Sequence, residues 1–263
     1  MENYYEINRH AWNLKTKIHA GSKFYDLEEF KKGNLSLKEI ELKEVGDVKG
    51  KSLIHLQCHF GLDTLSWARL GAGVTGVDVS DESIKLARSL ADELKLNAAF
   101  IRANLYDIPN IIKDKYDIVY TSYGALNWLD NIEKWAEIVS LLLKPKGVFH
   151  MIEFHPFIFT LDENCIIEDS YFNNVGPIDT TSAATYVDSE NKVPHRTVEW
   201  NHSLAEIINA LIKNGLRLEY LNEFPYQVYD CFPNMIEIEP GKWVFKAAGS
   251  RIPYMYSLKA VKA

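Results

Sequence analysis

Hydrophobic and polar positions follow two alternating rhythms through the middle of the chain. Short apolar runs predict strands near 53–57, 74–78, 98–102, 116–122 and 147–154. Amphipathic stretches predict helices between them, near 62–70, 81–95 and 131–143. Because strands and helices alternate, the pattern predicts a doubly wound α/β fold with a mostly parallel sheet and right-handed crossovers.

The start of the chain and one internal stretch depart from this rhythm. Residues 1–50 are polar and aromatic, and we expect them to form a helical lid over the site or to pack against the core. Within them, residues 36–39 match a capping box, which predicts that a helix begins near Leu37. The main domain is expected to span residues 51–263, with an insertion at about 156–200.

The insertion and the end of the chain carry further predicted elements. Strands at 180–187 and 193–200 would form a hairpin above the carboxyl edge of the sheet, a place suited to substrate selection or to a dimer contact. A helix is expected at 203–214, because Ser203 can cap its start. Strands at 216–224 and 252–261 would follow, with an aromatic loop between them.

Composition and charge narrow the class of protein. The chain has 263 residues, of which 47% are hydrophobic and 25% charged, as in ordinary soluble domains. A net charge of −7 disfavours a nucleic-acid partner, and no apolar run is long enough to span a membrane. The start of the chain lacks the features of a secretory signal. Cys58, Cys165 and Cys231 are too few and too widely spaced for a disulfide framework or a cysteine metal site, which favours a reducing cytoplasm and no metal.

The most informative stretch is the first predicted strand with the loop and strand that follow it. The strand ends in a loop at 57–61, and the next strand ends on Asp78. An acid about 20 residues past a nucleotide loop is placed to bind a ribose diol, so we expect a cofactor that contains adenosine. A dinucleotide oxidoreductase would prefer several glycines in this loop, whereas only Gly61 is present and His59 and Phe60 would crowd a pyrophosphate.

These residues resemble the class I S-adenosylmethionine-dependent methyltransferases, over about residues 50–155 and again in the last helix and strand pair. Gln57 and His59 stand where the family's loop has glycines. The resemblance implies a seven-stranded sheet with an antiparallel last strand, and S-adenosyl-L-methionine as cofactor. It implies cofactor-binding roles for Gln57, Cys58, His59, Gly61, Asp78, Val79, Asn104, Leu105 and Thr121.

Methyl transfer from a sulfonium needs an aligned nucleophile more than a dedicated catalyst, although a nucleophile that loses a proton needs a base. His155, Glu153 and Tyr123 are candidates for that base by location only. Three aromatic residues are candidates for substrate binding, with core packing as the alternative for each: Tyr25, Trp128 and Tyr229.

Together these features favour an S-adenosylmethionine-dependent methyltransferase that acts on a small molecule, with no nucleic-acid or membrane partner. Two alternatives stay open: a non-catalytic S-adenosylmethionine-binding protein, and a nicotinamide-dependent oxidoreductase. The insertion and the aromatic loop would also suit contacts within a homodimer.

Overall fold

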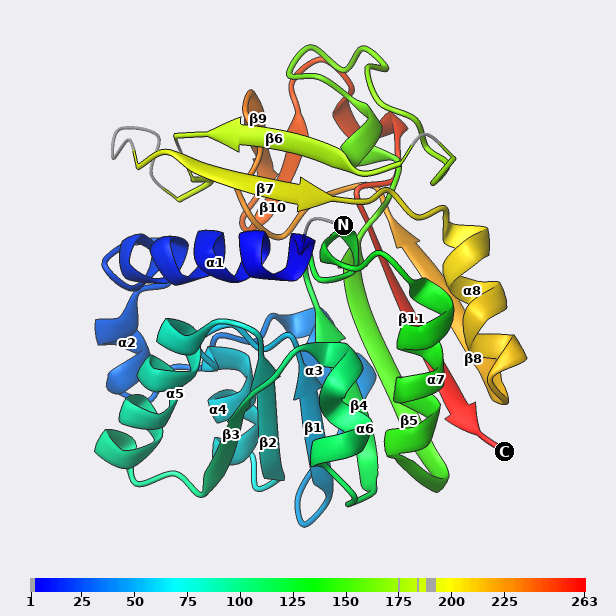
Figure 1. Cartoon of the computed structure of the whole chain (residues 1–263). Coiled ribbons are helices and arrows are strands. Elements are labelled where there is room, and N and C mark those ends of the chain that lie inside the picture. Colours follow the sequence, from blue (N-terminus) through cyan, green and yellow to red (C-terminus); the bar gives the residue numbers. More distant parts are fainter. Residues whose placement is uncertain (1–2, 175, 184, 188–192) are drawn as a thin grey trace.

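The computed structural model describes residues 3–174, 176–183, 185–187 and 193–263. The strands of its central sheet are β1 (Ser52–Leu56), β2 (Gly73–Asp78), β3 (Ala98–Arg102), β4 (Tyr116–Ser122), β5 (Leu143–Phe154), β8 (Leu216–Phe224) and β11 (Met255–Lys262). They lie in the order β3-β2-β1-β4-β5-β11-β8 (Figure 1). Strands β1 to β5 are parallel, and β11 is antiparallel to both of its neighbours, β5 and β8. The predicted mostly parallel sheet with an inserted antiparallel last strand is confirmed.

Helices cover both faces of this sheet and its carboxyl edge. The α-helices are α1 (Tyr4–Ala20), α2 (Leu27–Lys31), α3 (Glu39–Val45), α4 (Leu62–Arg69), α5 (Asp81–Leu94), α6 (Ile108–Ile111), α7 (Ile132–Leu142) and α8 (Leu204–Lys213). Short 3-10 helices occur at Leu105–Asp107, Leu126–Trp128, Ile158–Thr160 and Gly249–Arg251. No helix among the described residues is both long enough and apolar enough to cross a membrane.

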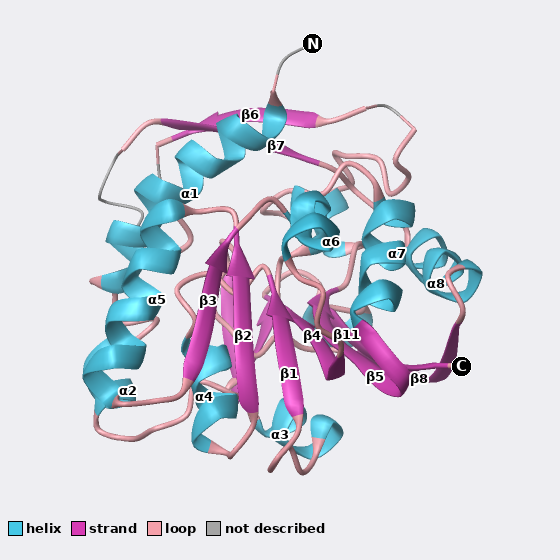
Figure 2. Ribbon diagram, turned by 60° about the horizontal axis from the view of Figure 1, so that its bottom comes forward, coloured by secondary structure: helices cyan, strands magenta, loops and turns pink. Residues whose placement is uncertain are grey.

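The side chains of β1 show how the two layers of helices form. Leu53 packs with Trp67 of α4 on one face, whereas the next residue, Ile54, packs in a cluster with Trp135 of α7 on the other. Successive residues of a strand point to opposite faces, so a strand that is apolar throughout needs helices on both sides. Helices α3 to α5 lie on one face and α6 to α8 on the other (Figure 2).

Two small hairpins stand apart from the sheet. Strands β6 (Ile178–Ser182) and β7 (His195–Glu199) form an antiparallel pair in the expected insertion. The first strand of this pair is shorter than predicted. The second hairpin, β9 (Met235–Glu239) with β10 (Lys242–Phe245), lies in the stretch that was predicted as an aromatic loop. Strand β9 is mostly exposed and the end of β10 is buried, so neither shows the alternation of buried and exposed residues that reveals a strand.

The N-terminal helix α1 lies across the carboxyl ends of the parallel strands (Figure 2). The Asn8 side chain donates to the Val198 carbonyl of β7 at 2.7 Å and accepts from its amide at 2.9 Å. Nearer the C-terminal end of α1, Thr16 and Ser83 of α5 share a hydroxyl hydrogen bond of 2.6 Å. Helix α1 is therefore attached both to the insertion and to the main domain.

Helix α3 begins two residues later than predicted. Its first residue is Glu39, and the Lys38 amide donates to the Glu41 carboxylate at 2.6 Å. The hydroxyl of Ser36 does not cap this helix; it donates to Asp63 at 2.5 Å. The predicted capping box is therefore wrong, because the tertiary contact with Asp63 takes the Ser36 hydroxyl that would have capped the helix.

Glu41 attaches α3 to the underside of the sheet and is fully buried. Its carboxyl group accepts hydrogen bonds from the hydroxyls of Tyr120 and Tyr123, the latter at 3.1 Å. Burial raises the pKa of Glu41 from 4.5 to about 8, and the neighbouring Asp63 acts in the same direction. The folded protein therefore binds this proton more tightly than the unfolded chain does.

This raised pKa predicts a loss of stability with increasing pH. The stabilisation is fully present below the unfolded pKa of 4.5 and is lost as the pH rises through the folded pKa of about 8. Glu41→Gln should remove a decline on the order of 5 kcal/mol in the free energy of unfolding. Urea denaturation of both proteins across this pH range measures the difference. Glu39→Gln, exposed on the same helix, is the control, and a decline equal to the wild type's in Glu41→Gln would contradict the assignment.

Candidate functional site

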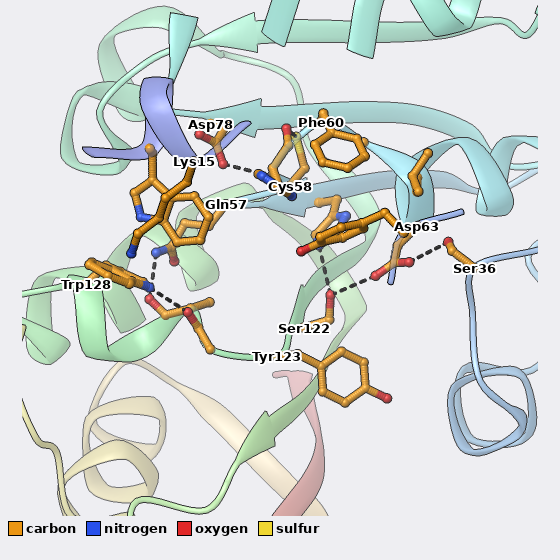
Figure 3. Close-up of a pocket in the computed structure, with 18 of the residues that line it drawn as sticks. Lys15, Ser36, Gln57, Cys58, Phe60, Asp63, Asp78, Ser122, Tyr123 and Trp128 are labelled. Carbon is orange, nitrogen blue, oxygen red and sulfur yellow. Dashed lines mark hydrogen bonds between the residues drawn. The ribbon is translucent and has the colours of Figure 1, made fainter. Parts of the chain in front are cut away.

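A cavity of about 710 Å³ lies between the carboxyl edge of the sheet and helix α1. Ligand pockets commonly have volumes of roughly 300–1,000 Å³, so the cavity can hold a cofactor-sized ligand. Segments far apart in the sequence line it, and Figure 3 shows side chains from several of them. They are the inner face of α1, residues 24–38, the loop after β1, the ends of β2 to β5, and residues near 186, 199 and 229–232.

The loop after β1 keeps the backbone conformation of a glycine loop although it has lost two glycines. Gln57 and His59 have φ values of 56° and 52°, and Gly61 has a φ of 81°. A left-handed backbone costs a residue with a side chain on the order of 1–3 kcal/mol, so surrounding contacts must hold it in place. One such contact is the hydrogen bond from Gln57 Nε2 to the carbonyl of Ala125, at 2.7 Å.

Glycine is required at position 61 for a second reason. A Cβ atom there would lie 2.6 Å from the Phe100 ring, which fills the space beneath the loop. The backbone of this loop therefore lies close against β3, and the helix α4 starts directly from it.

Asp78 lies at the tip of β2 and lines the cavity (Figure 3). Its two carboxylate oxygens accept hydrogen bonds from the backbone amides of His59 and Ser80, each at 2.8 Å. Burial raises the pKa of Asp78 to about 6, while these hydrogen bonds act in the opposite direction. Each oxygen retains a lone pair, so the carboxylate can accept further hydrogen bonds from a pair of hydroxyls.

The end of β3 forms the neighbouring part of the cavity. Asn104 accepts a hydrogen bond from the Tyr106 amide at 3.1 Å, which holds the chain in the turn that follows. Leu105 and Val79 line the cavity beside it. Two apolar side chains next to an amide form a slot suited to a planar ring with polar edges.

The structure brings together most of the predicted cofactor residues. Those that line the cavity are Gln57, Cys58, His59, Gly61, Asp78, Val79, Asn104 and Leu105. Thr121 does not line it and is fully buried. Because side chains alternate along a strand, the neighbouring Ser122 faces the cavity instead.

The predicted substrate residues line two different walls. Tyr25 and Tyr229 lie on one wall with Tyr123, whose ring centroid is 5.0 Å from that of Tyr229. Trp128 lies on another wall, where its ring meets that of Trp12 at a centroid distance of 5.2 Å. The N-terminal residues 1–50 thus supply part of the cavity wall, through Trp12 and Tyr25, as well as packing against the main domain.

Two of the three candidate bases are placed away from the cavity. Glu153 is buried, and its carboxylate accepts hydrogen bonds from the backbone amides of Gly124, Ala125 and Leu126, the last two at 2.7 and 3.3 Å. His155 pairs with Glu223 at 3.0 Å, and neither Glu153 nor His155 lines the cavity. Neither side chain is therefore placed to reach a group bound in the cavity, as a general base must. Tyr123 does line the cavity.

Sequence reasoning missed a buried polar network beside the loop. Asp63 accepts hydrogen bonds from the hydroxyls of Ser36 and Ser122, at 2.5 and 3.2 Å (Figure 3). His55 shares a hydrogen bond of 3.2 Å with the same Ser122. Burial raises the pKa of Asp63, and these hydroxyls act in the opposite direction. No local sequence pattern signals this network, because its members come from four separate segments.

The cavity face of α1 was also missed. Asn8, Trp12 and Lys15 line the cavity from above, and they are spaced four and three residues apart. That spacing places them on one face of the helix and is the signal that could have identified them.

Comparisons with known proteins agree with this geometry. Residues 54–147 match the family described as "Methyltransferase domain". Ubiquinone biosynthesis O-methyltransferase of Serratia proteamaculans is 30% identical over 153 residues, which cover 55% of this chain and 58% of that protein. The enzyme of the same name from Proteus mirabilis is 26% identical over 215 residues, which cover 76% of this chain and 79% of the relative.

A solved structure of an S-adenosylmethionine dependent methyltransferase from Mesorhizobium loti has a TM-score of 0.59 and 21% identity. The match covers 82% of this chain and 93% of that one, which shows a shared fold. The chain spans 58% of the length of its Serratia relative, less than two thirds.

Glu153 allows a test of how the segment after β4 is held. Glu153→Ala would leave several buried amides without an acceptor and should lower the free energy of unfolding by about 2–5 kcal/mol. Glu153→Gln retains one acceptor oxygen and should lose less. Glu137→Ala, exposed on α7, is the control and should change stability little. Urea denaturation measures all three, and a Glu153→Ala protein as stable as the control would contradict this role.

Proposed function

We propose that this chain, whose residues 54–147 match the family described as "Methyltransferase domain", is a class I S-adenosylmethionine-dependent methyltransferase that transfers the methyl group of S-adenosyl-L-methionine to a small-molecule acceptor. The observation that carries the proposal is the placement of Asp78 and the left-handed loop 57–61 on one side of a cavity whose other walls are aromatic. The same cavity can then hold the cofactor and the acceptor.

The residues present fit this cofactor. Asp78 has lone pairs available for the ribose diol, and Asn104 with Leu105 offers a slot for the adenine ring. Gln57 Oε1 and His59 Nε2 are buried, and no described residue provides them with a hydrogen-bond partner. A polar ligand in the cavity would supply the missing partners. When bound, S-adenosylmethionine supplies a methyl group made electrophilic by a sulfonium.

The remaining walls favour a small acceptor with a planar or apolar body. Tyr25, Tyr123 and Tyr229 form a wall with little polar surface apart from their hydroxyls. The names of the O-methyltransferase relatives support a hydroxyl group as the methyl acceptor. The aromatic walls of the cavity, which include Trp12 and Trp128 as well as these tyrosines, would contribute by aligning the acceptor, and alignment can supply much of the barrier reduction.

Tyr123 is better suited to positioning than to proton transfer. Its hydroxyl donates a hydrogen bond to Glu41 at 3.1 Å. Burial raises the pKa of Tyr123 well above its ordinary value, and the Glu41 charge acts in the same direction. A phenol with a raised pKa is a poor base at neutral pH.

We propose a cytoplasmic location, which is supported by the small number and wide spacing of Cys58, Cys165 and Cys231 in the sequence. The homodimer stays a prediction.

Calorimetric titration with S-adenosylmethionine, S-adenosylhomocysteine and NADH tests the cofactor class. We expect binding of the first two in the micromolar range and none of NADH. Asp78→Ala should weaken S-adenosylhomocysteine binding by roughly 1.5–3 kcal/mol, since hydrogen bonds to charged groups are of that order. Asp92→Ala, an exposed acid on α5, is the matched control and should bind normally. Binding of NADH alone would overturn the proposal, and unchanged affinity in a folded Asp78→Ala protein would overturn the role of Asp78.

We also propose that residues 1 to about 30 act as a lid that closes on the cofactor. This is supported by the position of α1 above the cavity, with Trp12 among the lining residues. S-adenosylhomocysteine should slow tryptic cleavage at Lys17 and Lys23, because bound ligand would hold α1 in place. NADH serves as the control ligand, and mass spectrometry of the fragments identifies the sites. Equal cleavage rates with and without S-adenosylhomocysteine would argue against a lid.

A further inference from the structure

The ammonium group of Lys15 faces the cavity without an anionic partner. Lys15 lies on the inner face of α1, and the residue is only 8% exposed. Its Nζ atom lies 5.0 Å from the ring centroid of Trp12 and 4.8 Å from that of Trp128. Nowhere in the described part of the chain does another residue form a hydrogen bond or an ion pair with Lys15. Figure 3 shows Lys15 beside Trp128.

This position is unfavourable for a cation unless a ligand compensates. Burial lowers the pKa of Lys15, which shows that the charged form is poorly solvated, and Glu199 offsets this only in part. The indole rings stabilise an ammonium by cation–π attraction, but they cannot accept its hydrogen bonds as an anion would. A buried cation without a partner is strongly disfavoured.

Glu199 lies close enough to influence Lys15 but is engaged elsewhere. Its carboxylate accepts a hydrogen bond from Asn127 Nδ2 at 2.7 Å and another from the Thr197 hydroxyl at 3.3 Å. These contacts hold the Glu199 carboxylate in place on β7 and leave the Lys15 ammonium free to bind an anion in the cavity.

We propose that Lys15 binds a carboxylate of the methyl acceptor, so that the acceptor is a small organic acid with a planar apolar body. This inference rests on the proposed methyltransferase function. The flat faces of Trp12 and Trp128 would pack against the body of the acid, and the ammonium between them would pair with its carboxylate.

The cofactor has a carboxylate of its own, but its requirements are better met elsewhere. Its ammonium and carboxylate are attached to one carbon, so they need an acid and a base side by side. Asp63 and Lys38 both line the cavity. Burial raises the pKa of Asp63, and the Lys38 ammonium, which lies 4.5 Å from the ring centroid of Tyr229, acts in the opposite direction. Asp63 and Lys15 lie at opposite sides of Figure 3.

The test uses two aromatic acids as probes, 4-hydroxybenzoate and phenylacetate, each compared with its neutral amide. Each compound is titrated by calorimetry into the full chain saturated with S-adenosylhomocysteine. We expect the wild type to bind at least one acid about tenfold or more tightly than its amide. Lys15→Met should abolish the difference, and Lys15→Arg should retain part of it. Lys17→Met, exposed on the same helix, should behave as the wild type.

Thermal denaturation separates a binding role from a structural one. Because Lys15→Met removes an unpaired buried charge but retains the length of the side chain, the variant should melt at the same temperature as the wild type or higher. A clear decrease would mean that Lys15 serves the fold and would overturn the proposal.

Two further results would also overturn it. One is a wild type with no preference for either acid, or a preference that survives in Lys15→Met. The other is a Lys15→Met protein with weaker S-adenosylhomocysteine binding but normal binding of 5′-methylthioadenosine, which lacks the amino acid. That pattern would assign Lys15 to the cofactor's carboxylate.

Failure of the proposed function is distinguishable from failure of this proposal. If S-adenosylhomocysteine does not bind the wild type at all, the proposed function fails. The same probe titrations on the free protein still decide the role of Lys15.

Discussion

The hydrogen bond from the His59 amide to the Asp78 carboxylate joins the ends of β1 and β2, and the cavity depends on it. Without it, the loop after β1 would have little reason to keep a left-handed backbone at two residues with side chains. Gln57 extends the connection by donating to the Ala125 carbonyl beyond β4. Three strand ends are thus linked by hydrogen bonds between side chains and backbone, which hold the floor of the cavity in one conformation.

Glu153 plays a similar part from within the sheet. Its buried carboxylate satisfies backbone amides of the segment that follows β4, where no regular ladder is available. The same segment carries Trp128, which forms a wall of the cavity. A side chain outside the cavity lining therefore positions several residues that line it. This explains why a buried acid near the site need not be a catalytic one.

The upper part of the cavity has a different character. Helix α1 contributes polar and aromatic side chains to a space that strand ends line from below, and it contacts both the insertion and α5. Its unpaired Lys15 and the buried acids Asp63 and Glu41 are groups whose charged forms are poorly solvated in the free protein. The two acids have hydrogen-bond donors within the protein, whereas Lys15 has no anionic partner, and a destabilising group of this kind is a common feature of binding sites.

The sequence by itself determined the order of strands and helices, the crossover pattern and the position of Asp78. The strands and helices follow from local periodicity. Because the carboxyl ends of parallel strands meet at the same edge of a sheet, a residue at the tip of such a strand can be placed at that edge from the sequence. The cofactor loop was recognisable for the same reason, although only the structure shows that Gln57 and His59 adopt a left-handed backbone in place of glycine. The choice of Ser122 over Thr121 as a lining residue depended on the register of one strand. Tertiary structure alone decided three features: the Asp63 network, the structural role of Glu153 and the lack of an anionic partner for Lys15. Each depends on how segments that are far apart in the sequence are arranged in space.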